Sequence, residues 1–244
     1  MNDKHVRKGI YILPNLLTTG ALFAGFSAII QATKDNFELA AILIFIAMVL
    51  DGLDGRVARM TNTTSEFGVE YDSLSDMVSF GLAPALVVYE WSLYTMGKLG
   101  WLVAFVYAVA AALRLARFNT HASPDKACFQ GLPSPSAAAV IAAFIWVIND
   151  YGESGVEYRL FVLALTLAVA ILMVSNVPYR SFKDFDLRSH VPFVVLIGVV
   201  TVLVVIVYDP PRVLFAGFFL YVLSGPVLAL VKRRRGNKTD NDTG

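Results

Sequence analysis

The sequence has little cysteine and little charge. It contains one cysteine in 244 residues, so no disulfide can form within the chain and no thiolate cluster can be built. Charged residues make up 16% of the chain, against about 25% in ordinary soluble domains. The net charge is only +1, which excludes a strongly basic nucleic-acid-binding protein and a self-repelling disordered chain.

Apolar residues take the place of the missing charge, at 57% of the chain and a mean hydropathy of +0.62. A helix needs about 20 mostly apolar residues to cross a bilayer core of about 30 Å. We find eight such stretches, the fifth of them short, and therefore predict an all-α, polytopic membrane helix bundle of about eight transmembrane helices. The stretches are 15–32, 39–60, 69–91, 99–118, 135–148, 160–177, 191–208 and 213–231.

The positive charges predict how this bundle is oriented. An even number of crossings places both termini on one side, and sixteen of the 20 Lys and Arg residues fall on that side. The positive-inside rule then makes both termini cytoplasmic, in what we expect to be the inner membrane of a bacterial or archaeal cell. We expect one membrane domain, 1–235, with an interfacial segment at 1–13, and a polar, disordered tail at 236–244. The four basic residues on the other side are Lys34, Lys98, Arg159 and Arg212.

Four aspartates stand at the facing ends of the second and third stretches, where charge is costly. Asp51 and Asp54 are three residues apart, and Asp72 and Asp76 are four apart, so each pair projects from one face of its helix. A charge at membrane depth costs at least about 2.5 kcal/mol even on the gentlest insertion scale. Because the two helices are consecutive and antiparallel, we expect the four carboxylates to converge and to be compensated there.

A metal site is the compensation that we favour. Four oxygen ligands suit hard divalent cations such as Mg²⁺ or Mn²⁺, and no His or Cys cluster is offered for zinc. In one alternative the acids are end charges paired with Arg56 and Arg59. In another, a cation transporter, they line an ion pathway, but that would spread acids through the later stretches, which are almost free of them.

Small residues and one arginine accompany the acids. Gly52, Gly55, Ala58 and Gly68 leave room for close helix approach or for a bulky ligand against the backbone. Arg59, four residues past Gly55, is placed to reach a phosphate oxygen that the metals also hold.

The run from Asp51 to Asp76 resembles, at every fixed position, the signature of the CDP-alcohol phosphotransferase family. The resemblance implies two divalent cations, Mg²⁺ or Mn²⁺, held by Asp51, Asp54, Asp72 and Asp76, with Asp76 as the general base. It also implies that the CDP moiety of the lipid substrate contacts Asn15 and Thr18 at the start of the first stretch, and Gly55, Ala58, Arg59, Ser65 and Gly68 within or beside the signature.

Two further segments, 113–119 and 129–135, resemble the phosphatidylserine synthase branch of that family. This resemblance implies transfer of the phosphatidyl group from CDP-diacylglycerol to the hydroxyl of L-serine, with release of CMP, in a homodimer embedded among membrane lipids. The active site would lie at the cytoplasmic boundary of the membrane, because CDP is water-soluble whereas the acyl chains are not.

Residues at the end of the fourth stretch indicate which alcohol accepts the phosphatidyl group. Arg114 and Arg117 are three residues apart and are followed by Asn119, so either arginine could hold a serine carboxylate with two hydrogen bonds. The plainer alternative is that they snorkel to lipid phosphates. A phosphorylated acceptor, glycerol 3-phosphate or an inositol phosphate, would call for more cationic residues near the site, so serine is preferred.

Overall fold

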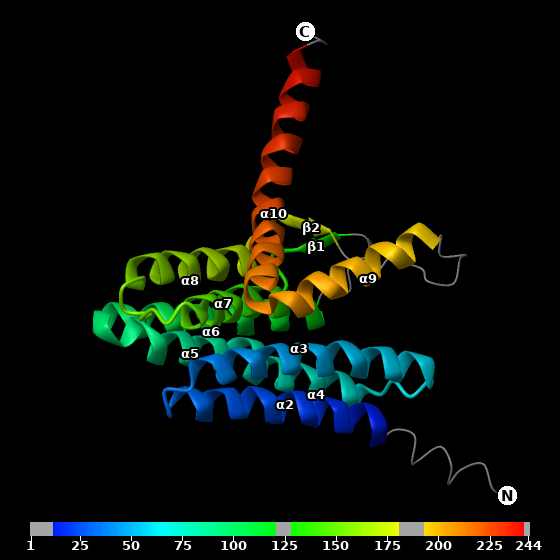
Figure 1. The fold of residues 1–244 in the computed structure, drawn as a ribbon. Coiled ribbons are helices and arrows are strands. Elements are labelled where there is room, and N and C mark those ends of the chain that lie inside the picture. The colour runs from blue at the N-terminus through cyan, green and yellow to red at the C-terminus, as the bar shows by residue number, and fades with distance from the viewer. Residues whose placement is uncertain (1–11, 121–127, 181–192, 242–244) are drawn as a thin grey trace, which may run out of the picture.

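The computed structural model describes residues 12–120, 128–180 and 193–241, and nearly all of its elements are helices (Figure 1). The helices are α2 (Ile12–Ala32), α3 (Phe37–Met60), α4 (Glu66–Asp76), the π-helix η1 (Met77–Leu82), α5 (Ala83–Trp91), the 3₁₀ turn η2 (Leu93–Met96), α6 (Lys98–Thr120), α7 (Ser134–Asp150), α8 (Arg159–Val174), α9 (Phe193–Tyr208) and α10 (Pro210–Asn241). Two short strands, β1 (Cys128–Gln130) and β2 (Pro178–Arg180), complete the fold.

The predicted all-α fold is confirmed, and most of each of the eight apolar stretches is helical in the described residues. The third stretch corresponds to α4, η1 and α5, which follow one another without a break. Within the described residues, three segments are long and apolar enough to cross a membrane, Ile12–Ala32, Lys98–Thr120 and Pro210–Ala229. The number of crossings and the side of the termini stay predictions.

The structure describes only part of the predicted N-terminal segment, 1–13, and of the predicted C-terminal tail, 236–244. Most of the expected interfacial segment lies outside the described residues, since α2 begins at Ile12. The expected tail starts inside α10, which ends at Asn241.

The helices form a stack in which α7 is the most enclosed element. Figure 1 shows the stack from α2 and α4 at the bottom, through α3, to α7 and α8 at the top, with α10 crossing it and extending beyond. α7 packs on both α3 and α10, and the run Ala137–Ile145 is buried throughout. Small side chains on α7 let the neighbouring helices approach closely, as in other membrane bundles.

The packing of α2 against η1 is the closest approach near the site. A Cβ atom on Gly25 would lie 2.7 Å from the Cα atom of Ser79, so glycine is required there. The hydroxyl of Ser79 donates to the carbonyl of Ala21 at 3.0 Å, and that of Ser75 donates to the carbonyl of Thr18 at 3.1 Å. These contacts fix the third helical stretch against the first.

Large apolar side chains cover the outside of the bundle. Phe23 and Phe26 on α2, Phe105 on α6, and Leu203 and Val207 on α9 are all exposed. Such a surface is unfavourable in water and suits contact with acyl chains, in agreement with an integral membrane protein.

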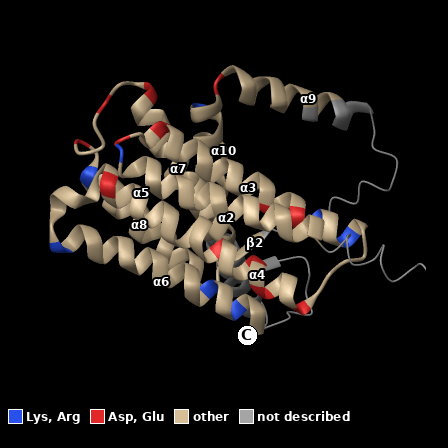
Figure 2. Ribbon diagram, turned by 90° about the horizontal axis from the view of Figure 1, so that it is seen from below, with Lys and Arg blue, Asp and Glu red and all other residues tan. Residues whose placement is uncertain are grey.

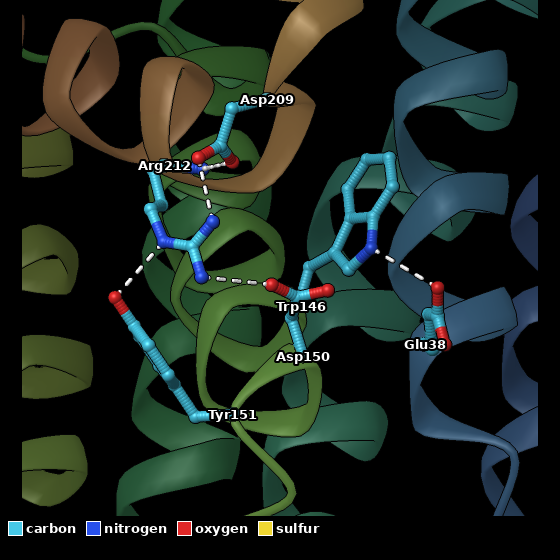
Figure 3. Close-up of polar contacts among 6 residues, drawn as sticks. All are labelled: Glu38, Trp146, Asp150, Tyr151, Asp209 and Arg212. Atoms are coloured by element: carbon cyan, nitrogen blue, oxygen red, sulfur yellow. Dashed lines mark hydrogen bonds and ion pairs between the residues drawn. The ribbon is translucent and has the colours of Figure 1, made fainter.

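Arg212, near the start of α10, binds three partners (Figure 3). It donates to Asp209 at 2.6 Å, to Asp150 at 3.0 Å and to the hydroxyl of Tyr151 at 2.9 Å. The hydrogen bond from Arg212 holds the pKa of Asp209 below its usual range. This network joins α10 to the end of α7, and beside it Trp146 donates to Glu38 at 3.3 Å.

The strands were not predicted. β1 and β2 pair antiparallel, with Phe129 opposite Tyr179, and bring the α6–α7 connection beside the α8–α9 connection. Tyr179 is fully buried and donates to the carbonyl of Val222 in α10 at 2.9 Å. Burial raises the pKa of Tyr179 to about 12, so its hydroxyl keeps the proton that it donates.

Candidate active site

Three of the four predicted aspartates meet where α3 ends and α4 begins. Carboxylate oxygens of Asp51, Asp72 and Asp76 all lie within 4.8 Å of one another, and the three side chains are half-buried. Figure 2 shows the acidic positions in the C-terminal part of α3 and in α4 gathered at one end of the bundle. The convergence follows because the chain reverses between α3 and α4, α2 packs on both helices, and α3 packs on η1 and α5, which continue α4.

The turn that reverses the chain between these helices has its own hydrogen bonds. Asn62 adopts a positive φ of 51°, and the hydroxyls of Thr61 and Thr63 lie 2.7 Å apart. Ser65 then caps α4, its hydroxyl accepting from the backbone N–H of Gly68 at 3.0 Å. A serine at this position satisfies one of the free N–H groups of the first helical turn, which defines where α4 starts.

Asp54 lies apart from this group of three, although it is close enough to Asp51 for their charges to interact. Its side chain is buried, and one carboxylate oxygen accepts from the hydroxyl of Thr18 at 2.6 Å. The same hydroxyl is 3.1 Å from the carbonyl of Pro14. Thr18, predicted to touch the nucleotide, is 4% exposed and contacts Asp54.

The other residues predicted to contact CDP fall into two places. Asn15, Ser65 and Gly68 lie together, because a Cβ on Gly68 would be 3.1 Å from the Ser65 hydroxyl and 3.6 Å from the Asn15 amide oxygen. Gly55 lies beside Arg59, whose guanidinium would be 3.7 Å from a Cβ on Gly55. Ala58 is half-buried, and its carbonyl accepts from Thr63 at the turn.

The structure separates the two arginines predicted to bind serine. Arg114 is close enough to Asp76 for their charges to attract, and it donates to the hydroxyl of Ser134 at 2.8 Å. Arg117 donates to Gln130 of β1 at 2.6 Å and to Asn176, two residues before β2, at 2.7 Å, so it contacts both connections that carry the strands.

Asn119, two residues after Arg117 on α6, contacts the acid-bearing helix. Its amide donates to the hydroxyl of Ser73 at 3.0 Å, and Ser73 follows Asp72 directly. Both Asn119 and Ser73 therefore lie beside the acid cluster without belonging to it.

The cluster of Asp51, Asp72 and Asp76 fits a divalent cation. It offers carboxylate oxygens alone, which hard cations such as Mg²⁺ and Mn²⁺ prefer. Three carboxylates so close together repel one another unless a positive charge lies among them. Arg114 supplies part of that charge, and a bound cation would supply the rest.

Two residues near the site were missed by the sequence analysis. Ser134 begins α7 and binds Arg114, and it lies inside the segment 129–135 that was singled out for its resemblance. Tyr107 is fully buried and donates to the carbonyl of Phe80 in η1 at 3.0 Å. Tyr107 lies seven residues before Arg114, two helical turns along the same face of α6, and this spacing was the available signal.

These features are those of a known enzyme family. Residues 11–174 match the family of CDP-alcohol phosphatidyltransferases, which covers the acid cluster and most of the bundle. The chain belongs to that family.

Individual relatives show which members of the family the chain is similar to. The CDP-diacylglycerol–serine O-phosphatidyltransferase of Helicobacter pylori is 40% identical over 191 residues, which cover 77% of this chain and 80% of the relative. The enzyme of the same name from Bacillus subtilis is 34% identical over 172 residues, 70% of this chain and 91% of the relative. The archaetidylserine synthase of Methanothermobacter thermautotrophicus is 35% identical over 181 residues, 73% of each chain.

Proposed function

We propose that this protein transfers the phosphatidyl group of CDP-diacylglycerol to the hydroxyl of L-serine, giving phosphatidylserine and CMP. The observation that carries the proposal is the convergence of Asp51, Asp72 and Asp76 in a chain of this family. Serine as the acceptor is supported by the relatives, whose names share it while the lipid part differs.

Two divalent cations, Mg²⁺ or Mn²⁺, are part of the proposal. Asp51, Asp72 and Asp76 would hold them, with Asp54 as the fourth ligand residue, oriented by Thr18. When bound, the cations supply positive charge that neutralises the diphosphate and the oxygen on which CMP leaves.

Asp76 is the general base in this proposal. The serine hydroxyl is a poor nucleophile until its proton is removed, and Asp76 takes that proton. The serine oxygen bonds to the phosphorus that carries the diacylglycerol, and the bond from this phosphorus to the bridging oxygen breaks. CMP leaves with the bridging oxygen. The attraction between Arg114 and Asp76 keeps the base close to α6, from which we expect the acceptor to approach.

Small and polar residues around the cluster would hold the CDP moiety. Gly55 and Ala58 leave space against α3, and Arg59 is exposed beside Gly55, where its guanidinium can pair with a phosphate. Asn15, Ser65 and Gly68 form a second group of polar and backbone contacts at the start of α4. Thr18 is assigned here through Asp54 rather than through the nucleotide.

Arg114 is the residue that we assign to the serine carboxylate. It is the arginine beside Asp76, and a carboxylate bound there would place the attached hydroxyl near the base. Arg117 and Asn119 would support this arrangement indirectly. Arg117 would do so through its hydrogen bond to Gln130 of β1, and Asn119 through its hydrogen bond to Ser73.

The site is proposed to face the cytoplasm from the inner membrane of a bacterial or archaeal cell, in a homodimer. The exposed apolar surface of the bundle supports the membrane part of this statement. The dimer rests on the family resemblance.

An acceptor screen tests the proposed function. Purified protein is incubated with CDP-diacylglycerol, Mn²⁺ and one acceptor at a time: L-serine, glycerol 3-phosphate or an inositol phosphate. We expect CMP and a lipid product with serine alone; a product with glycerol 3-phosphate alone would contradict the serine assignment.

A second experiment separates catalysis from cation transport. Asp76→Asn should abolish CMP release while the protein still inserts into liposomes, and EDTA should stop the wild-type reaction. Metal-dependent ion flux without CMP release would instead favour a transporter. Activity that persists in EDTA would contradict the metal site.

A further inference from the structure

The helix that carries Asp72 and Asp76 changes its winding directly after Asp76. Residues Met77–Leu82 form the π-helix η1, in which the N–H of Ala83 bonds to the carbonyl of Val78, five residues earlier. Such widened turns are rare and occur frequently at functional sites. η1 lies between the acids of α4 and the buried face of α5.

Pro84 accounts for the widened turn. In a continuous α-helix the carbonyl of Phe80 would accept from the N–H of residue 84, but proline has no N–H and its ring clashes with the carbonyl four residues earlier. The carbonyl of Phe80 therefore needs another donor. The hydroxyl of Tyr107 in α6 supplies it at 3.0 Å, and both residues are fully buried.

The neighbouring residues are small enough to bring α6 to this carbonyl. A Cβ on Gly81 would lie 3.3 Å from the Cβ of Ala111, one turn after Tyr107 on α6. On the opposite side, Ser79 donates to α2. The widened turn is thus held from two sides, by α6 and by α2.

The turn matters because it sets the direction of the acids relative to the core. Each α-helical residue turns the chain by about 100°, so one extra residue in a turn rotates what precedes it by about that angle. α5 is anchored by Val87, Val88 and Trp91, which are buried. In a regular helix Asp76, eleven residues before Val87, would lie on this buried face. The π-helix instead allows it to reach Asp51 and Asp72.

We propose that Tyr107 is a positioning residue for Asp76. Its hydroxyl stands in for the N–H that Pro84 lacks, stabilises the widened turn, and so keeps Asp76 among the other carboxylates. The inference rests on the proposed role of the acid cluster as a metal site, and it assigns to Tyr107 no contact with substrate.

Two substitutions test the inference from opposite sides. Tyr107→Phe keeps the ring and removes the donor. Pro84→Ala supplies an N–H at residue 84, so that the helix can regain regular winding while Tyr107 stays in place. We expect each to weaken binding of Mn²⁺ alone, followed by the electron paramagnetic resonance signal of the free ion, by about tenfold or more.

The chain offers a matched control for each variant. Tyr179→Phe removes another fully buried hydroxyl that donates to a backbone carbonyl, at 2.9 Å, but next to α10. Pro226→Ala removes a proline inside α10. We expect wild-type Mn²⁺ affinity in both controls. The melting temperature should fall for both Tyr107→Phe and Tyr179→Phe, whereas that of Pro84→Ala should be no lower than that of the wild type.

Kinetics give a second readout. With Mn²⁺ at saturation, Tyr107→Phe and Pro84→Ala should lower kcat and leave the KM for CDP-diacylglycerol within about twofold, because the residues proposed to contact the CDP moiety are untouched. If Mn²⁺ affinity in both variants equals that of the controls, the inference is overturned while the proposed function stands. If the wild-type protein binds no Mn²⁺, the metal site itself is overturned. Should Tyr107→Phe fail to fold, the comparison of Pro84→Ala with Pro226→Ala decides.

Discussion

Thr18 is the residue of α2 that binds Asp54, the acid beside the cluster. Its hydroxyl donates to Asp54, and a hydrogen bond to a charged group contributes about 1.5–3 kcal/mol. We expect Thr18→Val to leave Asp54 without this partner and to raise the Mn²⁺ concentration needed for half-maximal activity by about tenfold. Titration of activity with Mn²⁺ measures the effect, and an unchanged requirement would remove Thr18 from the site.

Thr166 is the control for that substitution. It is fully buried in α8, and within the described part of the chain its hydroxyl has no hydrogen-bond partner. Thr166→Val removes a buried unsatisfied group, so we expect unchanged activity and a melting temperature equal to or above that of the wild type. A gain of about 1 kcal/mol is the scale to expect.

Arg114 and Arg117 should respond differently to truncation. Only Arg114 is placed beside Asp76, so Arg114→Ala should raise the KM for serine by about tenfold or more, with a smaller change for CDP-diacylglycerol. Arg117→Ala should mainly lower the melting temperature, because its partners Gln130 and Asn176 hold the sheet. Steady-state kinetics with each substrate varied in turn decides, and the reverse ranking would exchange the two roles.

At the residue scale, helical spacing predicted four converging acids, of which the structure groups three, and it was insufficient to predict their partners. Asp51, Asp72 and Asp76 meet because their spacing and the antiparallel pairing leave few alternatives. The contact of Asp54 with Thr18, and of Arg117 with Gln130 and Asn176, depends on how distant helices pack. Periodicity within one helix carries no information of that kind.

The α2–η1 contact is an element-scale feature that a single added methyl group would disturb. Gly25→Ala would place a Cβ 2.7 Å from the backbone of Ser79, so the two elements must separate. We expect a loss of about 1–3 kcal/mol, seen as a lower melting temperature in detergent. Gly217→Ala, in α10 with nothing within 4 Å, is the control and should be neutral or slightly stabilising. Equal melting of the two variants would show that α2 and η1 are not tightly packed.

Hydropathy predicted the helical stretches and missed two features at the scale of elements. The change in winding after Asp76 follows from Pro84. Pro84 lies inside the apolar run 69–91 and does not interrupt its hydropathy, so hydropathy gave no sign of the change. The strands β1 and β2 are three residues each and pair across more than 45 intervening positions. Segments so short have no periodicity from which they could be recognised.

For the whole molecule, the distribution of basic residues predicts which ends of the helices face the cytoplasm. In a Cys128→Ser background, single cysteines at Thr64, in the turn between α3 and α4, and at Ser154, between α7 and α8, report on opposite ends. A membrane-impermeant maleimide should label Ser154→Cys in right-side-out vesicles and Thr64→Cys only in inverted ones. The opposite pattern would reverse the predicted orientation.

The two helices that supply the acids are neighbours in the chain, separated only by residues 61–65. The cluster therefore closes over a short stretch of sequence, and its assembly does not require α7 to α10. We expect the ribosome to have released both acid-bearing segments well before the last helix, so that they enter the bilayer together as a hairpin with their carboxylates left at the boundary. The costliest charges of the protein are then never carried through the hydrocarbon singly.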